Sequence, residues 1–262
     1  MRLIAFLHVV ALLSLTKEVH AQRRFHSTTD SIPPRHYFAF RVEAGVLFEK
    51  PVTTLTGNYQ LQSKPQGSFS GGFIYQLNMS RQWNTSYGLL LNIVSANYYL
   101  HIPDSDLKGF PSTGGAPQIL DKQVYYRASV PVFLTYNFKF SNKGFYGLHA
   151  GGKLHYSGGG TDMSLGVVMY DSSRRPNNLF KGHFIYNDGV WFSYTAGVSK
   201  TVLLENGGLL SFDLFGELSG ANFIHGDYQV TVPNQPVTTG DYKIKGSCVG
   251  LSLQYYFRKR RR

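Results

Sequence analysis

Residues 38–48 read FAFRVEAGVLF, and every second side chain in this stretch is apolar. One set of alternate positions holds Phe38, Phe40, Val42, Ala44, Val46 and Phe48, and the other holds Ala39, Arg41, Glu43, Gly45 and Leu47. Successive side chains of a β-strand point to opposite faces, so this alternation predicts a strand with one apolar face and one charged or small face.

The same alternation returns in seven further segments along the chain. They span residues 69–78, 87–94, 126–138, 146–156, 190–199, 210–218 and 248–257. Short connections at 79–84, 139–144 and 204–208 alternate with long ones at about 49–67, 100–123, 157–186 and 220–243, which we interpret as loops. This order is typical of an up-and-down barrel. The predicted fold is all-β: an eight-stranded antiparallel up-and-down transmembrane β-barrel over residues 37–257.

A soluble β-sandwich would also alternate polar and apolar faces, so alternation alone does not indicate a membrane protein. Charged residues make up only 16% of the chain and aromatic residues 15%, a charged share lower than in most soluble domains. Several segments reach the roughly 9 to 11 residues that a tilted strand needs to cross a bilayer. Aromatic residues gather near segment ends, where an interfacial girdle would lie. These are Tyr98, Tyr99, Tyr125, Tyr126, Tyr136, Phe138, Tyr255, Tyr256 and Phe257.

The first residues have the layout of a secretory leader. Arg2 precedes an apolar run over residues 3–15, and Val19-His20-Ala21 supplies the compact residues of a cleavage site. We expect cleavage between Ala21 and Gln22, export through the Sec pathway, and a disordered lead-in over 22–36. No later stretch approaches the 18 or so apolar residues of a transmembrane helix, so we expect a barrel in the bacterial outer membrane.

The formal net charge of +11 is concentrated at the two ends of the chain. The tail at 258–262 reads RKRRR, and Arg23, Arg24 and Arg35 lie near the expected mature start. Export argues against a nucleic-acid partner. We interpret the tail as solvated, or as contacting acidic lipid headgroups or an acidic periplasmic partner. The expected partners are outer-membrane lipid and a periplasmic or extracellular protein, and we expect a monomer.

Charged residues on the polar faces of the strands form the candidate site. By parity they should face a lumen just wide enough to be filled by side chains, so they should pair with one another. These residues are Arg41, Glu43, Arg127, His149, Lys153, His155, Asp213 and Glu217. We interpret them as a polar plug; the alternative is a narrow pore or proton path. By the same parity Cys248 faces the interior as a small hydrophobe.

No pattern in the sequence indicates an enzyme. His101, His183 and His225 lie near the long connections, but no Gly-x-Ser-x-Gly motif marks a nucleophile. Asp104 and Asp106 read as solvated loop carboxylates. We therefore expect no catalytic residues, no cofactor and no bound metal, with a lipid-modifying enzyme of the outer membrane kept as an alternative.

Residues 126–138, YRASVPVFLTYNF, and 145–156, FYGLHAGGKLHY, carry a resemblance to a known family. The chain resembles the outer-membrane β-barrel domain common in Bacteroidota, the PorT-like group, which is related in architecture to OmpA/OmpX-type small barrels. The resemblance implies an accessory role in protein secretion, whereas the strand pattern itself favours a structural or binding barrel. Such barrels commonly finish on an aromatic residue, but here five basic residues follow Phe257.

Overall fold

A computed structural model describes residues 36–48, 52–63, 67–110, 118–141, 144–158, 162–186, 189–204, 208–222 and 224–257. All of them belong to one compact unit that begins at Pro33. The expected leader with its cleavage site at Ala21 and Gln22, the lead-in up to residue 35, and the tail at 258–262 lie outside the described residues. Within the described ranges, no helix is long and apolar enough to cross a membrane.

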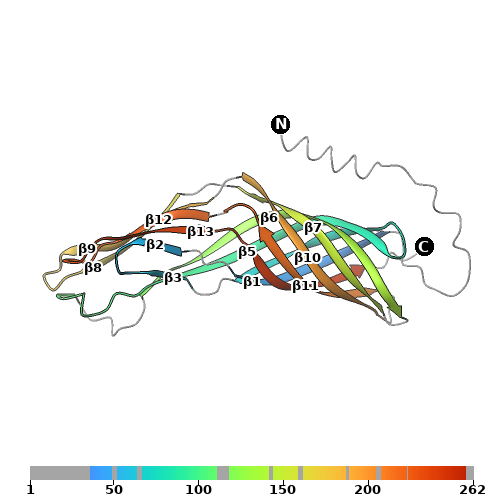
Figure 1. Cartoon of the computed structure of the whole chain (residues 1–262), viewed down its shortest axis with the longest axis horizontal. Coiled ribbons are helices and arrows are strands. Elements are labelled where there is room, and N and C mark those ends of the chain that lie inside the picture. The colour runs from blue at the N-terminus through green and yellow to red at the C-terminus, as the bar shows by residue number, and fades with distance from the viewer. Residues whose placement is uncertain are drawn as a thin grey trace, which may run out of the picture. The chain divides into compact units, whose positions relative to one another are not determined.

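Eight antiparallel strands close into a barrel, as the alternation predicts (Figure 1). Each barrel strand pairs with the next barrel strand along the chain. The last one, β14, pairs with the first, β1, which closes the cylinder. The strands are β1 (His36–Leu47), β4 (Gly67–Asn78), β5 (Trp83–Leu100), β6 (Gln118–Ser141), β7 (Gly144–Ser157), β10 (Gly189–Leu203), β11 (Leu209–Ser219) and β14 (Cys248–Phe257). The fold class predicted from the sequence is confirmed.

The closure between the first and last barrel strands is regular. The register runs from Phe38 opposite Phe257 to Leu47 opposite Cys248. On the other side of the barrel, β5 pairs with both β4 and β6. A closed cylinder leaves no sheet edge, so every barrel strand has a hydrogen-bonding neighbour on both sides.

The long connections are not the irregular loops that we expected. They contain six further strands: β2 (Val52–Thr56), β3 (Leu61–Ser63), β8 (Asp162–Tyr170), β9 (Pro176–Tyr186), β12 (Ile224–Val230) and β13 (Thr238–Ile244). Five of these form a second sheet in the order β2-β13-β12-β9-β8, and β3 pairs with the far end of β5. Figure 1 shows the strands of the second sheet side by side. We call these six strands, with the far ends of β5 and β6, the lobe.

Aromatic rings fill the interior of the lobe. The ring of Tyr98 stacks on Phe184 with centroids 5.6 Å apart and meets Tyr242 edge-on at 4.9 Å. The Tyr98 hydroxyl also contacts the hydroxyls of Tyr242 and Tyr125. One apolar core therefore joins the far ends of β5 and β6 to the second sheet. Tyr98 and Tyr125, which we placed in the membrane girdle, are buried in this core instead.

Candidate functional site

The outer face of the barrel is apolar. Its exposed side chains include Phe40, Phe69, Phe73, Leu89, Leu91, Val132, Leu134, Leu148, Val190, Phe192, Val198, Phe212, Leu214, Leu251 and Leu253. Leu91 and Leu251 each keep 65% of their surface exposed, so the described residues leave most of these side chains uncovered. Monomeric soluble proteins rarely leave such a continuous apolar surface open to water.

An aromatic belt follows the short-turn end of the barrel, the end at which the strands are joined by the short connections. Trp83 packs on Tyr136 at 5.0 Å, Phe138 on Tyr146 at 6.1 Å, and Phe38 on Phe257 at 6.1 Å. Aromatic side chains concentrate at this depth in transmembrane barrels because their rings suit the interface between hydrocarbon and water. Tyr256, which we also placed in the girdle, faces the lumen.

The lumen holds all eight residues of the candidate polar network. Their backbone positions alternate with the lipid-facing set, and each side chain is buried. They come from four strands: Arg41 and Glu43 from β1, Arg127 from β6, His149, Lys153 and His155 from β7, and Asp213 and Glu217 from β11. Strand β7 contributes three of the eight, more than any other strand.

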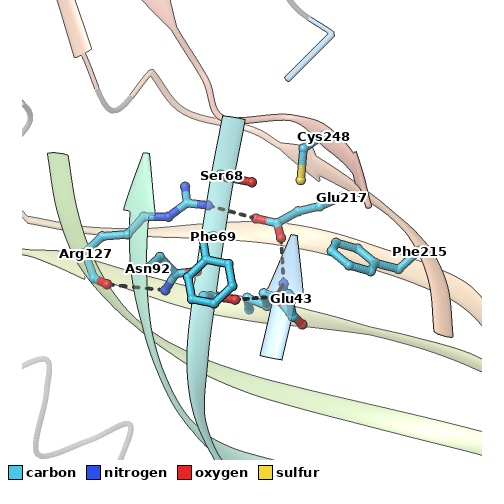
Figure 2. Close-up of a pocket in the computed structure, with 10 residues that line it drawn as sticks. Glu43, Ser68, Phe69, Asn92, Arg127, Phe215, Glu217 and Cys248 are labelled. Carbon is cyan, nitrogen blue, oxygen red and sulfur yellow. Dashed lines mark hydrogen bonds and ion pairs between the residues drawn. The ribbon is translucent and has the colours of Figure 1, made fainter. Parts of the chain in front are cut away.

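Lys153 lies at the centre of the network. Its Nζ donates to Glu43 Oε2 at 2.7 Å and to Glu217 Oε2 at 2.8 Å. The same ammonium group sits 4.9 Å from the centre of the Phe215 ring. Figure 2 shows Glu43, Glu217 and Phe215 in this part of the lumen, with Cys248 beside them. One cation is thereby neutralised by two carboxylates and covered by an aromatic face.

Arg41 makes the second cluster. Its Nε lies 2.7 Å from Glu43 Oε1, and one terminal nitrogen lies 2.8 Å from Asp213 Oδ2. The other terminal nitrogen donates to Gln254 Oε1 at 3.2 Å. Because Glu43 also binds Lys153, it joins the two clusters into one network that crosses the lumen.

Two histidines of β7 contact carboxylates of the network, and one of them also contacts serine hydroxyls. His155 lies between Ser129 Oγ at 2.6 Å and Ser193 Oγ at 2.8 Å, and its Nε2 is 3.0 Å from Glu217. His149 Nδ1 lies 3.4 Å from Asp213 Oδ1. The imidazoles therefore connect strands β6, β7, β10 and β11 across the lumen.

The charges of the network balance. Arg41, Arg127 and Lys153 face Glu43, Asp213 and Glu217, and Arg127 lies 3.7 Å from Glu217. Three positive and three negative groups give no net charge when both histidines are neutral. Burying an unpaired charge is costly, and here each formal charge has an opposite one within 4 Å. Chemically, this arrangement is suited to filling and fixing a lumen.

The uncharged members of the network were left out of the sequence-based site. They are Ser70, Asn92, Ser129, Ser193, Ser252 and Gln254, all buried. Ser70 donates to Glu43 at 2.8 Å, and Ser252 donates to Asp213 at 3.2 Å. The parity that selects the charged residues also selects these, so the alternation was enough to find them.

A polar vestibule lies on the short-turn side of Arg41 and Asp213. Its lining is mostly amide and hydroxyl: Gln76, Asn84, Ser86, Thr135, Asn137, Ser199, Thr201 and Ser211. On the other side of the network, a smaller hollow is lined by Glu43, Asn92, Arg127, Lys153 and Glu217. The charged layer thus separates the vestibule from the lobe.

The lobe carries the remaining candidate residues. His101 and His225 are exposed, and His183 Nδ1 lies 3.9 Å from the exposed Asp227. Asp106 accepts a hydrogen bond from the Tyr59 hydroxyl at 2.9 Å, and burial together with this carboxylate raises the pKa of Tyr59 to about 12. Across the described residues, no group of three His, Cys, Asp or Glu side chains is arranged to hold a metal ion.

An apolar outside, a charged inside and a closed ladder together define the class of this fold, a transmembrane β-barrel. No known protein family and no curated protein matches the sequence. Among solved structures, the outer membrane protein OprG from Pseudomonas aeruginosa matches with a TM-score of 0.43 and 8% identity, covering 86% of this chain and 96% of that chain.

Two further matches are weaker. The toluene transporter TodX of P. putida has a TM-score of 0.30 and 7% identity, with 88% of this chain and 91% of that chain covered. The CymD monoaromatic hydrocarbon channel has a TM-score of 0.30 and 11% identity, with 86% and 89% covered. Similarity at this level carries no functional argument, so the fold class rests on the strand pairing and the side-chain distribution of the chain itself.

Proposed function

We propose that this protein is an integral β-barrel of a bacterial outer membrane with a sealed lumen, and that it binds its partners through the lobe. The observation that carries the proposal is the neutral network across the lumen, centred on Lys153 between Glu43 and Glu217. The apolar core of the lobe lies beyond it and includes Trp191, Phe215 and Cys248 of the barrel strands. A hydrated ion would have to displace both.

The outer-membrane location is supported by the polarity of the two faces of the barrel and by the layout of residues 1–22. Short turns at one end and long connections at the other match the usual arrangement of such barrels, with the turns towards the periplasm. In that orientation the lobe faces outward. A folded sheet at this position offers a fixed surface for an extracellular partner.

The direct test is reconstitution into planar lipid bilayers. We expect a heat-modifiable gel shift, which reports a folded barrel, and single-channel conductance near zero. A general porin reconstituted in the same bilayers gives the positive control. Steady conductance from the folded protein would contradict the sealed lumen, and a detergent-free soluble product without a gel shift would contradict the membrane barrel.

A more specific form of this proposal is an accessory role in protein secretion across the outer membrane. It is supported by the resemblance of residues 126–138 and 145–156 to the PorT-like barrels of Bacteroidota. Affinity purification from mildly solubilised membranes, with quantitative mass spectrometry, should then recover subunits of a secretion complex. Recovery of the barrel alone at all detergent concentrations would leave only the binding role.

Ester hydrolysis is a second candidate function, favoured by one observation. Ser164, His183 and Asp227 are direct neighbours across β8, β9 and β12, in the order nucleophile, base and orienting carboxylate. A fluorophosphonate probe should label Ser164 in the folded protein, and Ser164→Ala or His183→Gln should abolish labelling. This candidate is excluded if the fluorophosphonate does not label the wild type and a thiol-reactive ester does not label a Ser164→Cys variant.

A further inference from the structure

Three exposed cations accompany the aromatic belt at the short-turn end. Arg81 precedes Trp83 in the turn between β4 and β5, and Lys139 follows Phe138 in β6. Lys200 of β10 places its Nζ 5.5 Å from the centre of the Tyr146 ring. Lys200 thus contacts a ring of the belt, and Arg81 and Lys139 lie within two residues of belt residues in the sequence, at the depth where a lipid headgroup would lie.

The three cations follow one stretch of the barrel wall, from the β4–β5 turn across β6 and β7 to β10. The Asn137 N–H donates to the Gln82 carbonyl at 2.6 Å, which brings the turn of Arg81 beside the end of β6. Phe138 is opposite Tyr146 on β7, and Tyr146 is opposite Lys200 on β10. Together Arg81, Lys139 and Lys200 form a cationic collar over one side of the barrel.

The backbone is distorted where Lys139 enters the collar. Strand parity alone would turn Lys139 towards the lumen, because the outward positions of β6 are the even-numbered ones, such as Val132 and Leu134. A register shift between Phe138 and Ser141 interrupts the ladder, and Lys139 adopts a φ of 49°. A non-glycine residue in this left-handed region is strained, and here the strained residue is exposed.

Opposite charge is missing from the described surface at this end. The acidic residues of the barrel strands are Glu43, Asp213 and Glu217, which are buried in the lumen, and Asp121, which pairs with Tyr98 at the lobe end of β6. None of the described residues at the short-turn end is an exposed Asp or Glu; Glu205 lies outside the described ranges. Past Phe257, the last residue of β14 at the same end, the sequence continues as RKRRR.

We propose that the cationic collar binds the phosphate groups of anionic phospholipids in the leaflet nearest the short turns. This rests on the proposed membrane location, and it adds a lipid preference to it. The belt rings place the collar at headgroup depth, and three exposed positive side chains on one side of the barrel favour an anionic headgroup over a zwitterionic one. Contact with a lipid surface, and not with an acidic protein, follows from the position of Lys200 against a lipid-facing ring.

Trp83 provides a local reporter for the test. The chain has two tryptophans, of which Trp83 is 42% exposed in the belt and Trp191 is buried. The protein is reconstituted into vesicles that contain brominated phosphatidylglycerol or brominated phosphatidylcholine, and quenching of Trp83 gives the relative affinity for the two lipids. A Trp83→Phe variant supplies the background.

We expect roughly a fivefold preference of the wild type for phosphatidylglycerol, which shrinks as added salt screens the charges. The triple variant R81Q/K139Q/K200Q should bring the ratio to about one. The matched control K181Q/K243Q/K245Q removes the same number of charges from the lobe and should keep the preference.

Each other outcome overturns the collar. A wild type without preference, a triple variant that keeps it, or a control that loses it equally would show that these three cations do not select the lipid. In those cases an intact heat-modifiable gel shift leaves the membrane barrel standing. Absence of quenching by either lipid would instead overturn the membrane location and the collar together.

Discussion

Lys153 holds Glu43 and Glu217 on two sides of one ammonium group, with distances of 2.7 and 2.8 Å. Replacing it with methionine removes the cation and leaves two carboxylates buried in the lumen. Breaking a buried ion pair by removing one partner typically costs about 3 kcal/mol or more. We expect Lys153→Met to lower the free energy of unfolding by about that amount, measured by urea titration in detergent with the gel shift as readout.

Lys200 provides the matched control, because it is exposed on the outer face. Lys200→Met should change the unfolding free energy by less than about 1 kcal/mol. The double variant K153M/E43Q leaves Arg41 opposite Asp213 and Arg127 opposite Glu217, so the network is again neutral and much of the loss should be recovered. An equal loss for Lys153→Met and Lys200→Met would contradict the central position of Lys153.

A substitution of Lys139 should stabilise the barrel, whereas one of Lys153 should destabilise it. The φ of 49° at Lys139 suits glycine better than lysine. Lys139→Gly should stabilise the barrel by about 1 kcal/mol by removing the left-handed strain. In the same variant the lipid preference of Trp83 should weaken. Urea unfolding and brominated-lipid quenching check the two effects separately, and a destabilised Lys139→Gly would show that the backbone is not strained there.

For a single residue, the sequence predicts which face of the strand its side chain occupies but not which residue it contacts. Alternation placed Arg41 and Asp213 on the polar faces of their strands. Their contact at 2.8 Å joins positions 172 residues apart, and it depends on how the strands are staggered around the cylinder. Stagger is set by the whole ladder, which no local pattern shows.

At the scale of elements, the eight barrel strands were predictable and the lobe strands were not. Barrel strands are long and keep one continuous apolar face. Strands β12 and β13 have seven residues each, and their buried faces mix Tyr228 and Tyr242 with glycine and threonine. Short strands rich in polar residues resemble loop sequences, so their pairing is decided by the aromatic core that they share with β5 and β9.

The tyrosines of the lobe predict a distinct response to alkali. The pKa of Tyr59 is raised from 10.0 to about 12, and burial also raises the pKa of Tyr98. A raised pKa means that the folded lobe favours the neutral phenol, so this stability is present below pH 10 and is lost as the pH rises through about 12.

We expect the near-ultraviolet circular dichroism of the lobe to disappear above pH 10 while the heat-modifiable gel shift persists. In a spectrophotometric titration, Tyr59→Phe should remove one phenol that ionises near pH 12. If the difference between the two titrations instead lies near pH 10, the Tyr59 hydroxyl is not held by burial and Asp106.

At the scale of the whole molecule, the barrel and the lobe share strands. The β5–β6 ladder runs from Trp83 opposite Tyr136 to Leu100 opposite Gln118, through both parts. The lobe is therefore built on extensions of the barrel wall and has its own hydrogen-bonded sheet, which should protect it from exchange with solvent.

Hydrogen exchange measured by mass spectrometry separates this arrangement from mobile loops. Amides of β9 and β12 should exchange at least about 100-fold more slowly than those of residues 101–110, which include no strand. The barrel strand β10 serves as the slow reference. Fast exchange in β9 and β12 would show that the second sheet does not persist in the membrane-embedded protein.

The pairing of β1 with β14 also fixes the order of events during biogenesis. One edge of β1 pairs with β14, the last strand to be synthesised. The barrel therefore cannot close before residues 248–257 have been made. Until then the incomplete sheet has two unpaired edges, which can pair with other polypeptides. A chain truncated before residue 248 would leave those edges permanently open, and it should be degraded rather than inserted as a smaller barrel.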